Sequence, residues 1–304
     1  MTETERGALP SASSPPSSRG ARAGGPGDGG DDGPRLSLPS IAPPPSFFAH
    51  HYERTLRLID HLGEVTLLIG RMFRALPRRP LEWRSTLHQM ESLGVRSMGI
   101  VTVTSIFIGM VMTIQFAFGL RRFGGLEYIP RVIVLSFARE LAPTLTAVIV
   151  GGRIGSGMAA EVGAMNVTEQ VDAIRALGAD PAKKLVLPRT VAAVLVMPLL
   201  SIFALSLGTL GAVIICYSQF DISPSFFMQS SLESVQMGDL LSGLAKTPIF
   251  GFIIAIVGCH FGLQTRGGTE GVGLSTTRTV VVVSIAILIA DFFLTKIFIG
   301  ITGS

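Results

Sequence analysis

Five long apolar runs constrain the fold of this chain more than any other feature of its 304 residues. They cover about residues 99–120, 132–152, 191–217, 240–263 and 279–300, and each holds 21 or more residues. A helix needs about 20 residues to cross a hydrocarbon core roughly 30 Å thick, because each residue advances it by about 1.5 Å. We therefore predict an all-α integral membrane protein with five membrane-spanning helices.

The composition argues against several other classes of protein. Charged residues make up only 15% of the chain and hydrophobic residues 48%, which does not suit an ordinary soluble enzyme. The net charge of +4 is too small to indicate nucleic-acid binding. Cys216 and Cys259 lie inside apolar runs and predict neither a disulfide framework nor a zinc site. Walker A, HExxH and GxSxG patterns are absent from the sequence, so we expect no enzymatic activity, metal or cofactor in this chain.

The residues before the first run form two regions. Gly, Pro and Ser fill 24 of residues 1–45, a composition that predicts a disordered cytoplasmic tail. Residues 46–92 instead repeat apolar residues at steps of three and four, which places on one helix face Leu58, Leu62, Val65, Ile69, Met72 and Leu76. A basic amphipathic helix before a span is typical of the bilayer interface, so we predict an interfacial helix there. A helix packed only on protein is the alternative, and residues 93–304 form the five-span domain.

The distribution of Lys and Arg predicts the orientation in the membrane. The connection 153–190 holds five of them, 264–278 holds two, and 46–98 holds eight. On the other side, 121–131 holds three and 218–239 holds none. Cytoplasmic segments carry the excess of Lys and Arg, so we place the amino terminus and the 153–190 connection in the cytoplasm and the carboxyl terminus outside.

Three ionisable residues lie well inside the apolar runs, where a charge is expensive and by default functional. Arg139 and Glu140 lie in the second run and Asp291 in the fifth. Helical rise puts Arg139 and Asp291 at nearly the same depth, so we predict that they form an ion pair. Glu140 points about 100° away from Arg139, and one of the two is free to face a cavity. Lys246 and Lys296, nearer the outer ends, are expected to extend toward the interface.

The 153–190 connection contains signals for a short cytoplasmic helix. Asn166 and Glu169 have the spacing of a capping box, and Gly178 is placed to end the helix that follows. Asp180 and Pro181 then have the pattern of an N-cap and first position of the next helix. The polar side chains of the short helix form a surface on which a soluble partner is expected to dock.

Several of these residues also make a recognisable pattern. It comprises Ile108-Gly109-Met110-Val111, Arg139-Glu140-Leu141 with Pro143, Gly152-Arg153, Gly155-Ser156, Glu161, Gly163, Met165, Glu169-Gln170, Asp180-Pro181, Pro188-Arg189, Thr276-Thr277-Arg278-Thr279 and Asp291. With this pattern, residues 50–300 resemble the MlaE (YrbE-type) permease family of lipid-transporting ABC systems. The tail at 1–45 has no counterpart in the short members of that family.

The resemblance implies a function and a set of partners. It implies a homodimeric permease in a bacterial inner membrane, with a fold similar to the transmembrane domains of ABCG-type exporters. A cytoplasmic ATPase dimer would bind the ATP and magnesium, a periplasmic MCE-domain hexamer would exchange phospholipid with the permease, and a small STAS-domain protein often accompanies the ATPase. The implied role is phospholipid movement between the inner membrane and the MCE protein, which maintains outer-membrane lipid asymmetry.

The resemblance also implies two groups of site residues. The lipid-binding cavity would be lined by Met112, Leu120, Phe123, Arg139, Glu140 and Leu141, of which Met112 and Phe123 differ in type from the family pattern. The helix that couples to the ATPase would involve Glu161, Gly163, Met165, Glu169, Gln170, Asp172 and Arg175.

Two other functions remain open from the residues alone. An ion-coupled secondary transporter or channel would use Arg139, Glu140 and Asp291 as its ion sites, although no internal repeat is evident. An integral-membrane enzyme would need a catalytic motif that we do not find.

Overall fold

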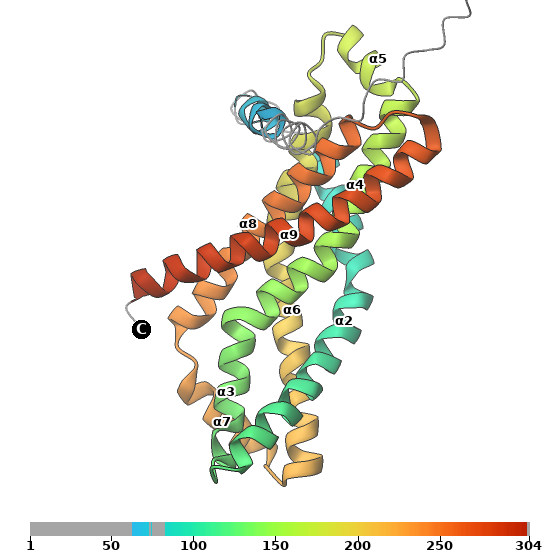
Figure 1. Ribbon diagram of the computed structural model, residues 1–304. Helices are drawn as coiled ribbons and strands as arrows, with labels where there is room; N and C mark the ends of the chain where they lie inside the picture. The colour runs from blue at the N-terminus through green and yellow to red at the C-terminus, as the bar shows by residue number, and fades with distance from the viewer. Residues whose placement is uncertain (1–62, 73, 75–82, 303–304) are drawn as a thin grey trace, which may run out of the picture. The chain divides into compact units, whose positions relative to one another are not determined.

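A computed structural model of the chain describes residues 63–72, 74 and 83–302. The predicted tail at 1–45 and most of the predicted interfacial region at 46–92 lie outside these residues. Within them, every regular element is a helix (Figure 1). In chain order, after a helical segment at 63–72, these are α2 (Trp83–Arg121), η1 (Leu126–Tyr128), α3 (Ile129–Ser136), η2 (Phe137–Leu145), α4 (Thr146–Val167), α5 (Gln170–Ala176), η3 (Ala182–Val186), α6 (Leu187–Phe220), α7 (Pro224–Ser234), α8 (Met237–Leu263) and α9 (Gly268–Thr302).

Five helices are long and apolar enough to cross a membrane, as predicted. They are Trp83–Arg121, Leu126–Val167, Ala182–Phe220, Met237–Leu263 and Gly268–Gly300. Their ends differ from the prediction, because helices continue beyond the apolar runs. The first has 39 residues, or roughly 58 Å at 1.5 Å per residue, and begins inside the region assigned to the interfacial helix.

Small residues allow the helices to pack closely. An added Cβ on Gly109 of α2 would lie 2.1 Å from the carbonyl oxygen of Gly208 of α6. Figure 1 also shows α9 crossing α4 obliquely, and α4 packs against both α8 and α9. Close backbone approach through small residues is typical of helices packed in lipid, which have no hydrophobic force to bring them together.

The connection between α4 and α6 differs from the prediction at its start. Asn166 does not cap a new helix, because α4 continues to Val167 and the Asn166 amide donates to the Thr265 carbonyl at 2.9 Å. Instead, Glu169 adopts a left-handed conformation with φ of 60° and begins α5. Gly178, with φ of 75°, follows α5, and the Asp180 carboxylate accepts the Ala182 N–H at 2.9 Å.

The helical segment at 63–72 places part of the predicted apolar stripe against the rest of the protein. Met72 is buried, and Val65 and Ile69 are partly buried against the core. Its position at the bilayer interface stays a prediction.

Candidate functional site

The second spanning helix contains a π-helical segment, η2, at the Arg139-Glu140 pair. Pro143 lies inside this segment and has no backbone N–H, so it cannot donate the usual helical hydrogen bond to the carbonyl of Arg139, four residues earlier. The Lys246 ammonium donates to that carbonyl at 3.3 Å. Proline and π-helical segments alter the direction of a helix, and such segments are frequent at functional sites.

Lys246 of α8 is the centre of a polar cluster that joins three spanning helices. Its side chain is only 2% exposed. The ammonium lies 2.8 Å from Glu140 Oε1 on η2 and 3.4 Å from Asp291 Oδ1 on α9. It also donates to Thr295 Oγ1 at 2.6 Å, and Thr295 in turn donates to Glu140 at 3.0 Å. The Lys246 ammonium therefore has two carboxylates and a hydroxyl group as partners. A buried ion needs such partners, because removing it from water is costly.

Gly243 explains how α8 comes near enough for this contact. A Cβ on Gly243 would lie 2.0 Å from the carbonyl oxygen of Ala138 in η2. Asp239, Gly243 and Lys246 follow one another at steps of four and three, so they share one face of α8. The close approach at the glycine brings the two charged side chains of that face against η2.

Arg139 forms the other ion pair of the cluster, with Asp239. The Arg139 Nε donates to Asp239 Oδ1 at 2.7 Å, and its terminal nitrogen lies 2.5 Å from the same oxygen. The other oxygen of Asp239 accepts the backbone N–H of Gln236, as part of a capping box at the start of α8. The Arg139 side chain is 38% exposed, whereas that of Asp239 is 9% exposed.

The predicted ion pair between Arg139 and Asp291 is therefore wrong. Equal depth does not make two residues neighbours, and the depth argument treated the helices as straight and upright. In the structure α9 is oblique, and Lys246 of α8 takes Asp291 as its partner. The prediction that Lys246 extends toward the interface is also wrong, because three polar side chains hold it inside.

Two cavities meet at Glu140. One, of about 460 Å³, is lined by Arg139, Asp239 and Lys246 together with Ser242 and Phe298. The other, of about 560 Å³, presents a mostly apolar surface from Leu288, Phe292 and Ile299 of α9. Its polar lining residues on α9 are Asp291, Thr295 and Lys296. Glu140 borders both, so a single carboxylate lies between a charged space and an apolar one.

The other predicted cavity residues are not gathered at this place. Leu141 lines a separate small pocket with residues of α2. Met112 and Leu120 are partly buried against the core. Phe123, in the loop after α2, is 87% exposed. Within the described part of one chain, only Arg139 and Glu140 of the predicted set line the charged cavity.

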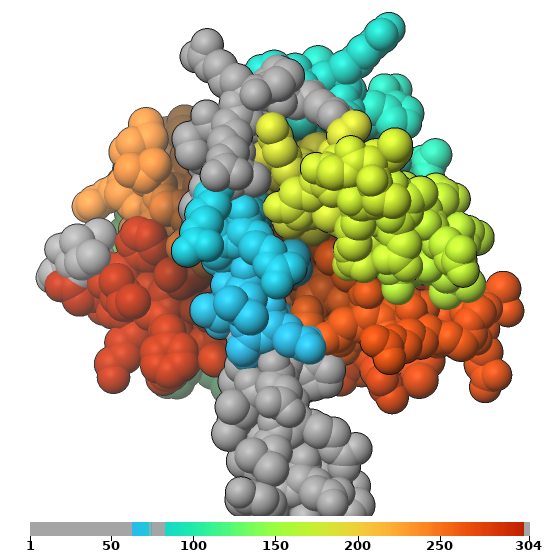
Figure 2. All heavy atoms as spheres, turned by 90° about the horizontal axis from the view of Figure 1, so that it is seen from above, coloured from blue at the N-terminus to red at the C-terminus, as the bar shows by residue number. Residues whose placement is uncertain are grey.

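The residues expected to couple to an ATPase divide between two helices. Glu161, Gly163 and Met165 belong to α4, where Glu161 Oε2 lies 3.2 Å from a guanidinium nitrogen of Arg189. Asp172 and Arg175 belong to α5 and form an exposed ion pair of 2.7 Å. The space-filling view in Figure 2 shows α5, in yellow-green, standing out at the surface. The side chain of Val171 in α5 is buried, whereas Leu177, the residue directly after α5, is 85% exposed.

No cluster of His, Cys, Asp and Glu able to hold a metal ion occurs among the described residues. The Lys246 cluster has the groups of a binding site: two cations, three carboxylates and a threonine hydroxyl beside an apolar surface. Such a combination suits an amphipathic ligand with a charged part and a hydrocarbon part.

Comparison with known proteins identifies the family. The family described as Permease MlaE matches residues 86–297. The chain belongs to the MlaE permease family. A probable ABC transporter permease protein of Synechocystis sp. is 44% identical over 236 residues, covering 78% of this chain and 90% of the relative. One from Rickettsia bellii is 37% identical over 81% of this chain and 95% of its own length.

A third relative of this MlaE-family chain comes from a plant. The Arabidopsis thaliana protein named TRIGALACTOSYLDIACYLGLYCEROL 1, chloroplastic, is 38% identical over 77% of this chain and 67% of its own length. Family membership and the five apolar helices together show that this chain is a multi-pass membrane protein.

Three residues of the cluster were not predicted as site residues. Asp239 lies at the edge of the fourth apolar run, Lys246 is predicted to extend toward the interface, and Thr295 is an uncharged residue of the fifth run. The shared face of Asp239, Gly243 and Lys246 is the signal that would have found the two charged residues, since both charges then point to one neighbour.

Proposed function

We propose that this chain is the membrane-spanning permease subunit of an ABC transporter that moves phospholipid. The proposal depends mainly on the position of Glu140. This residue of a spanning helix borders both a charged cavity and a mostly apolar one. A phospholipid has a charged headgroup and two acyl chains, so it needs both surroundings at adjacent depths. The relative named after a galactosylated diacylglycerol supports a lipid as the ligand.

The energy for transport would come from a partner. We infer that a cytoplasmic ATPase dimer binds ATP and magnesium and docks on α5 and the end of α4. Closure of the ATPase would push α5, and the buried Val171 and the short turn between α4 and α5 would transmit the motion to the spanning helices. The π-helical segment that carries Glu140 belongs to the same spanning helix as α4, so this motion would change the space around Glu140.

The family resemblance supports a proposal for the complete assembly. We infer a homodimer similar to the transmembrane domains of ABCG-type exporters, with the lipid cavity completed by Met112, Leu120, Phe123 and Leu141 at the contact between two copies. A periplasmic MCE-domain hexamer would exchange phospholipid with the outer mouth, and a STAS-domain protein would accompany the ATPase. In a bacterial inner membrane this exchange would maintain outer-membrane lipid asymmetry.

Reconstituted transport tests the role of Glu140. In proteoliposomes that contain the chain and its ATPase, we expect ATP-dependent phospholipid movement, and Glu140→Gln should lower the rate at least about tenfold, the effect of losing one charge-assisted contact. The matched control is Glu233→Gln, because Glu233 is an exposed glutamate on α7, away from the cluster. Equal transport by Glu140→Gln and by the control would remove Glu140 from the lipid path.

Co-purification tests the role of α5. Glu169→Lys reverses an exposed charge at the start of α5, and we expect it to release the ATPase from the permease. Glu169→Gly is the control for the turn, because glycine accepts the left-handed conformation without strain. Retention of the ATPase by Glu169→Lys would contradict this contact.

An ion-coupled transporter is the second candidate, and the charge balance of the cluster favours considering it. Two cations, Arg139 and Lys246, face three carboxylates, so one negative charge is left over when all five are ionised. Transport that requires an ion gradient and proceeds without ATP would support this candidate against the ABC permease.

A further inference from the structure

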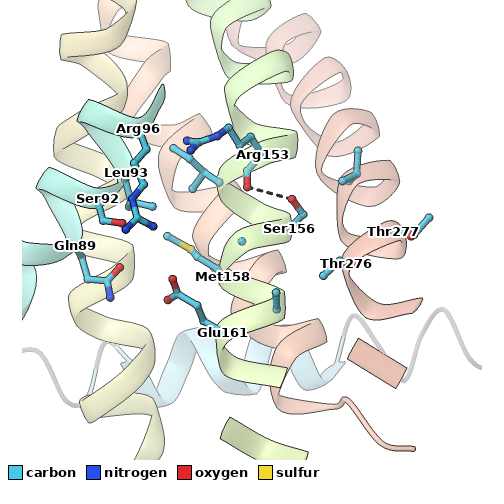
Figure 3. A pocket seen from close by; sticks show the side chains of 14 residues that line it. Gln89, Ser92, Leu93, Arg96, Arg153, Ser156, Met158, Glu161, Thr276 and Thr277 are labelled. Carbon is cyan, nitrogen blue, oxygen red and sulfur yellow. Dashed lines mark hydrogen bonds between the residues drawn. The ribbon is translucent and has the colours of Figure 1, made fainter. Parts of the chain in front are cut away.

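Another cavity, which does not include Glu140, lies where the ends of three spanning helices meet. It has a volume of about 550 Å³ and lies between α2, α4 and α9 (Figure 3). Its apolar lining comes from Leu93, Ile154, Met158 and Val280. Its polar lining includes Arg96, Arg153 and Glu161, with the hydroxyl groups of Ser92, Ser156 and Thr276. A volume of this size is typical of small-molecule sites, which range over roughly 300–1,000 Å³.

The charges around this cavity leave an excess of positive charge. Arg96 has no ion pair or hydrogen bond with any of the described residues, and the only such partner of Arg153 is the Ser97 hydroxyl, at 2.8 Å. The one carboxylate, Glu161, is already paired with Arg189. In Figure 3 the Arg153 side chain extends from α4 toward α2, the helix that carries Arg96. Two guanidinium groups without an anion therefore face the cavity, while the Ser156 and Thr276 hydroxyls already donate to the carbonyls of Arg153 and Gly273.

The position of the cavity indicates where its ligand comes from. The lining residues lie just before the apolar run of α2, at the end of that of α4 and at the start of that of α9. Successive spans alternate in direction, so these three points lie at the same edge of the membrane. At that edge the phosphate groups of lipids lie level with interfacial arginines, while the acyl chains reach the apolar surface beyond.

We propose that this cavity binds the phosphodiester headgroup of an anionic lipid from the leaflet at that edge. Arg96 and Arg153 would hold the phosphate, because guanidinium groups bind phosphate oxygens through paired N–H donors. The acyl chains would lie along Val280 and the apolar faces of α2 and α9. The inference rests on the proposed function and adds to it a second lipid site, on the opposite side of the membrane from the loop that holds Phe123.

Protection of an introduced thiol tests the proposal. Ser156→Cys places a thiol in the cavity with almost no change of size, and the two natural cysteines are fully buried. We would measure the rate of its modification by a water-soluble thiosulfonate reagent in the full chain, purified in detergent. Dihexanoyl phosphatidylglycerol, added as a soluble probe, should slow the modification at least about tenfold. Ser92→Cys reports on the opposite wall and serves if the first variant does not fold.

The controls separate the possible ligands. Ser225→Cys, on the exposed end of α7, should react at the same rate with and without the probe. Inorganic phosphate or dihexanoyl phosphatidylcholine should protect Ser156→Cys much less. Equal protection by phosphate would show a site for the free ion, and equal protection by phosphatidylcholine would show that net charge is not recognised. Either result would overturn the proposal.

One substitution links the protection to the unpaired arginine. Arg96→Gln should abolish most of the protection, whereas Arg84→Gln, an exposed arginine on the same helix, should leave it unchanged. Protection that survives Arg96→Gln would also overturn the proposal. This measurement needs neither ATP nor transport, so its failure is distinguishable from a failure of the permease function.

Discussion

Lys246 shows how a single buried charge organises this protein. Its ammonium has three N–H donors but four oxygen neighbours, on Glu140, Asp291, Thr295 and the Arg139 carbonyl. The four oxygens come from η2 and α9, and the lysine comes from α8. The cost of removing this charge from water is offset only because these partners surround it. The residue therefore fixes the relative position of three helices as well as the orientation of Glu140.

Removal of the Lys246 charge should destabilise the protein. Lys246→Met keeps much of the side-chain volume but leaves Glu140 and Asp291 facing each other without a cation. Breaking a fully buried ion pair costs about 3–5 kcal/mol. The Glu140 side chain is 40% exposed, so we expect a smaller cost and still a clearly lower midpoint of thermal unfolding in detergent. Lys296→Met, on the exposed side of α9, should change the midpoint little. Similar midpoints for the two variants would contradict the bridging role of Lys246.

The charges themselves were predictable at this scale, but their partners were not. Arg139, Glu140 and Asp291 stand out in apolar runs, so the sequence indicated a polar site inside the membrane. Choosing partners needs the rotation of each helix about its axis and its tilt. Pro143 changes the rotation of its helix, and packing sets the tilt of α9. Neither quantity can be calculated from the depth of a residue in the membrane.

Among the helices, α2 and α6 show most directly what a small residue does. Gly109 and Gly208 allow the two backbones to touch, with no room for a Cβ between them. Thr113, one turn after Gly109, bonds its hydroxyl to the Gly109 carbonyl at 2.7 Å and so hides a polar group in this contact. The packing of these two helices therefore depends on the absence of a single methyl group.

Two alanine substitutions on α2 should have effects of opposite sign. Gly109→Ala would force the helices apart, and overpacking of this kind costs about 1–3 kcal/mol. Gly99→Ala, ten residues earlier, has nothing within 4 Å of its new Cβ and should stabilise the helix by about 0.5–1 kcal/mol. Thermal unfolding of the two variants beside the parent chain measures both changes. A stabilising effect of Gly109→Ala would show that α2 and α6 pack less closely than described.

The sequence predicted which segments form spanning helices, but it predicted less well where those helices begin and end. All five spans appear where apolar runs of sufficient length predict them. The ends moved because polar residues can extend a helix beyond the apolar run, as α2 does back to Trp83. Asn166 was assigned to a capping box by its spacing, but its bond to Thr265, 99 residues away, keeps it inside α4. A contact between distant segments thus decided what a local signal could not.

In the molecule as a whole, the helices differ in how much of their apolar surface is covered. Only 11% of the apolar stretch of α9 is buried, against 44% of that of α8. Exposed side chains along α9 include Val281, Ile285, Leu288, Phe292 and Ile299. An apolar surface of this extent is stable against lipid or another apolar protein surface and not against water. This agrees with a membrane subunit and suits the proposed homodimer.

The orientation of the whole molecule gives the last prediction. The bundle has α5 at one end and α7 at the other (Figure 1), and the excess of Lys and Arg lies in the segments on the α5 side. Leu177→Cys, beside α5, should therefore react with an impermeant thiol reagent only in inside-out membrane vesicles, and Ser225→Cys on α7 only in right-side-out vesicles. The natural cysteines are buried and should give a low background. The opposite pattern would put α5 beyond the reach of a cytoplasmic ATPase, and the proposed coupling would fail even if the fold is correct.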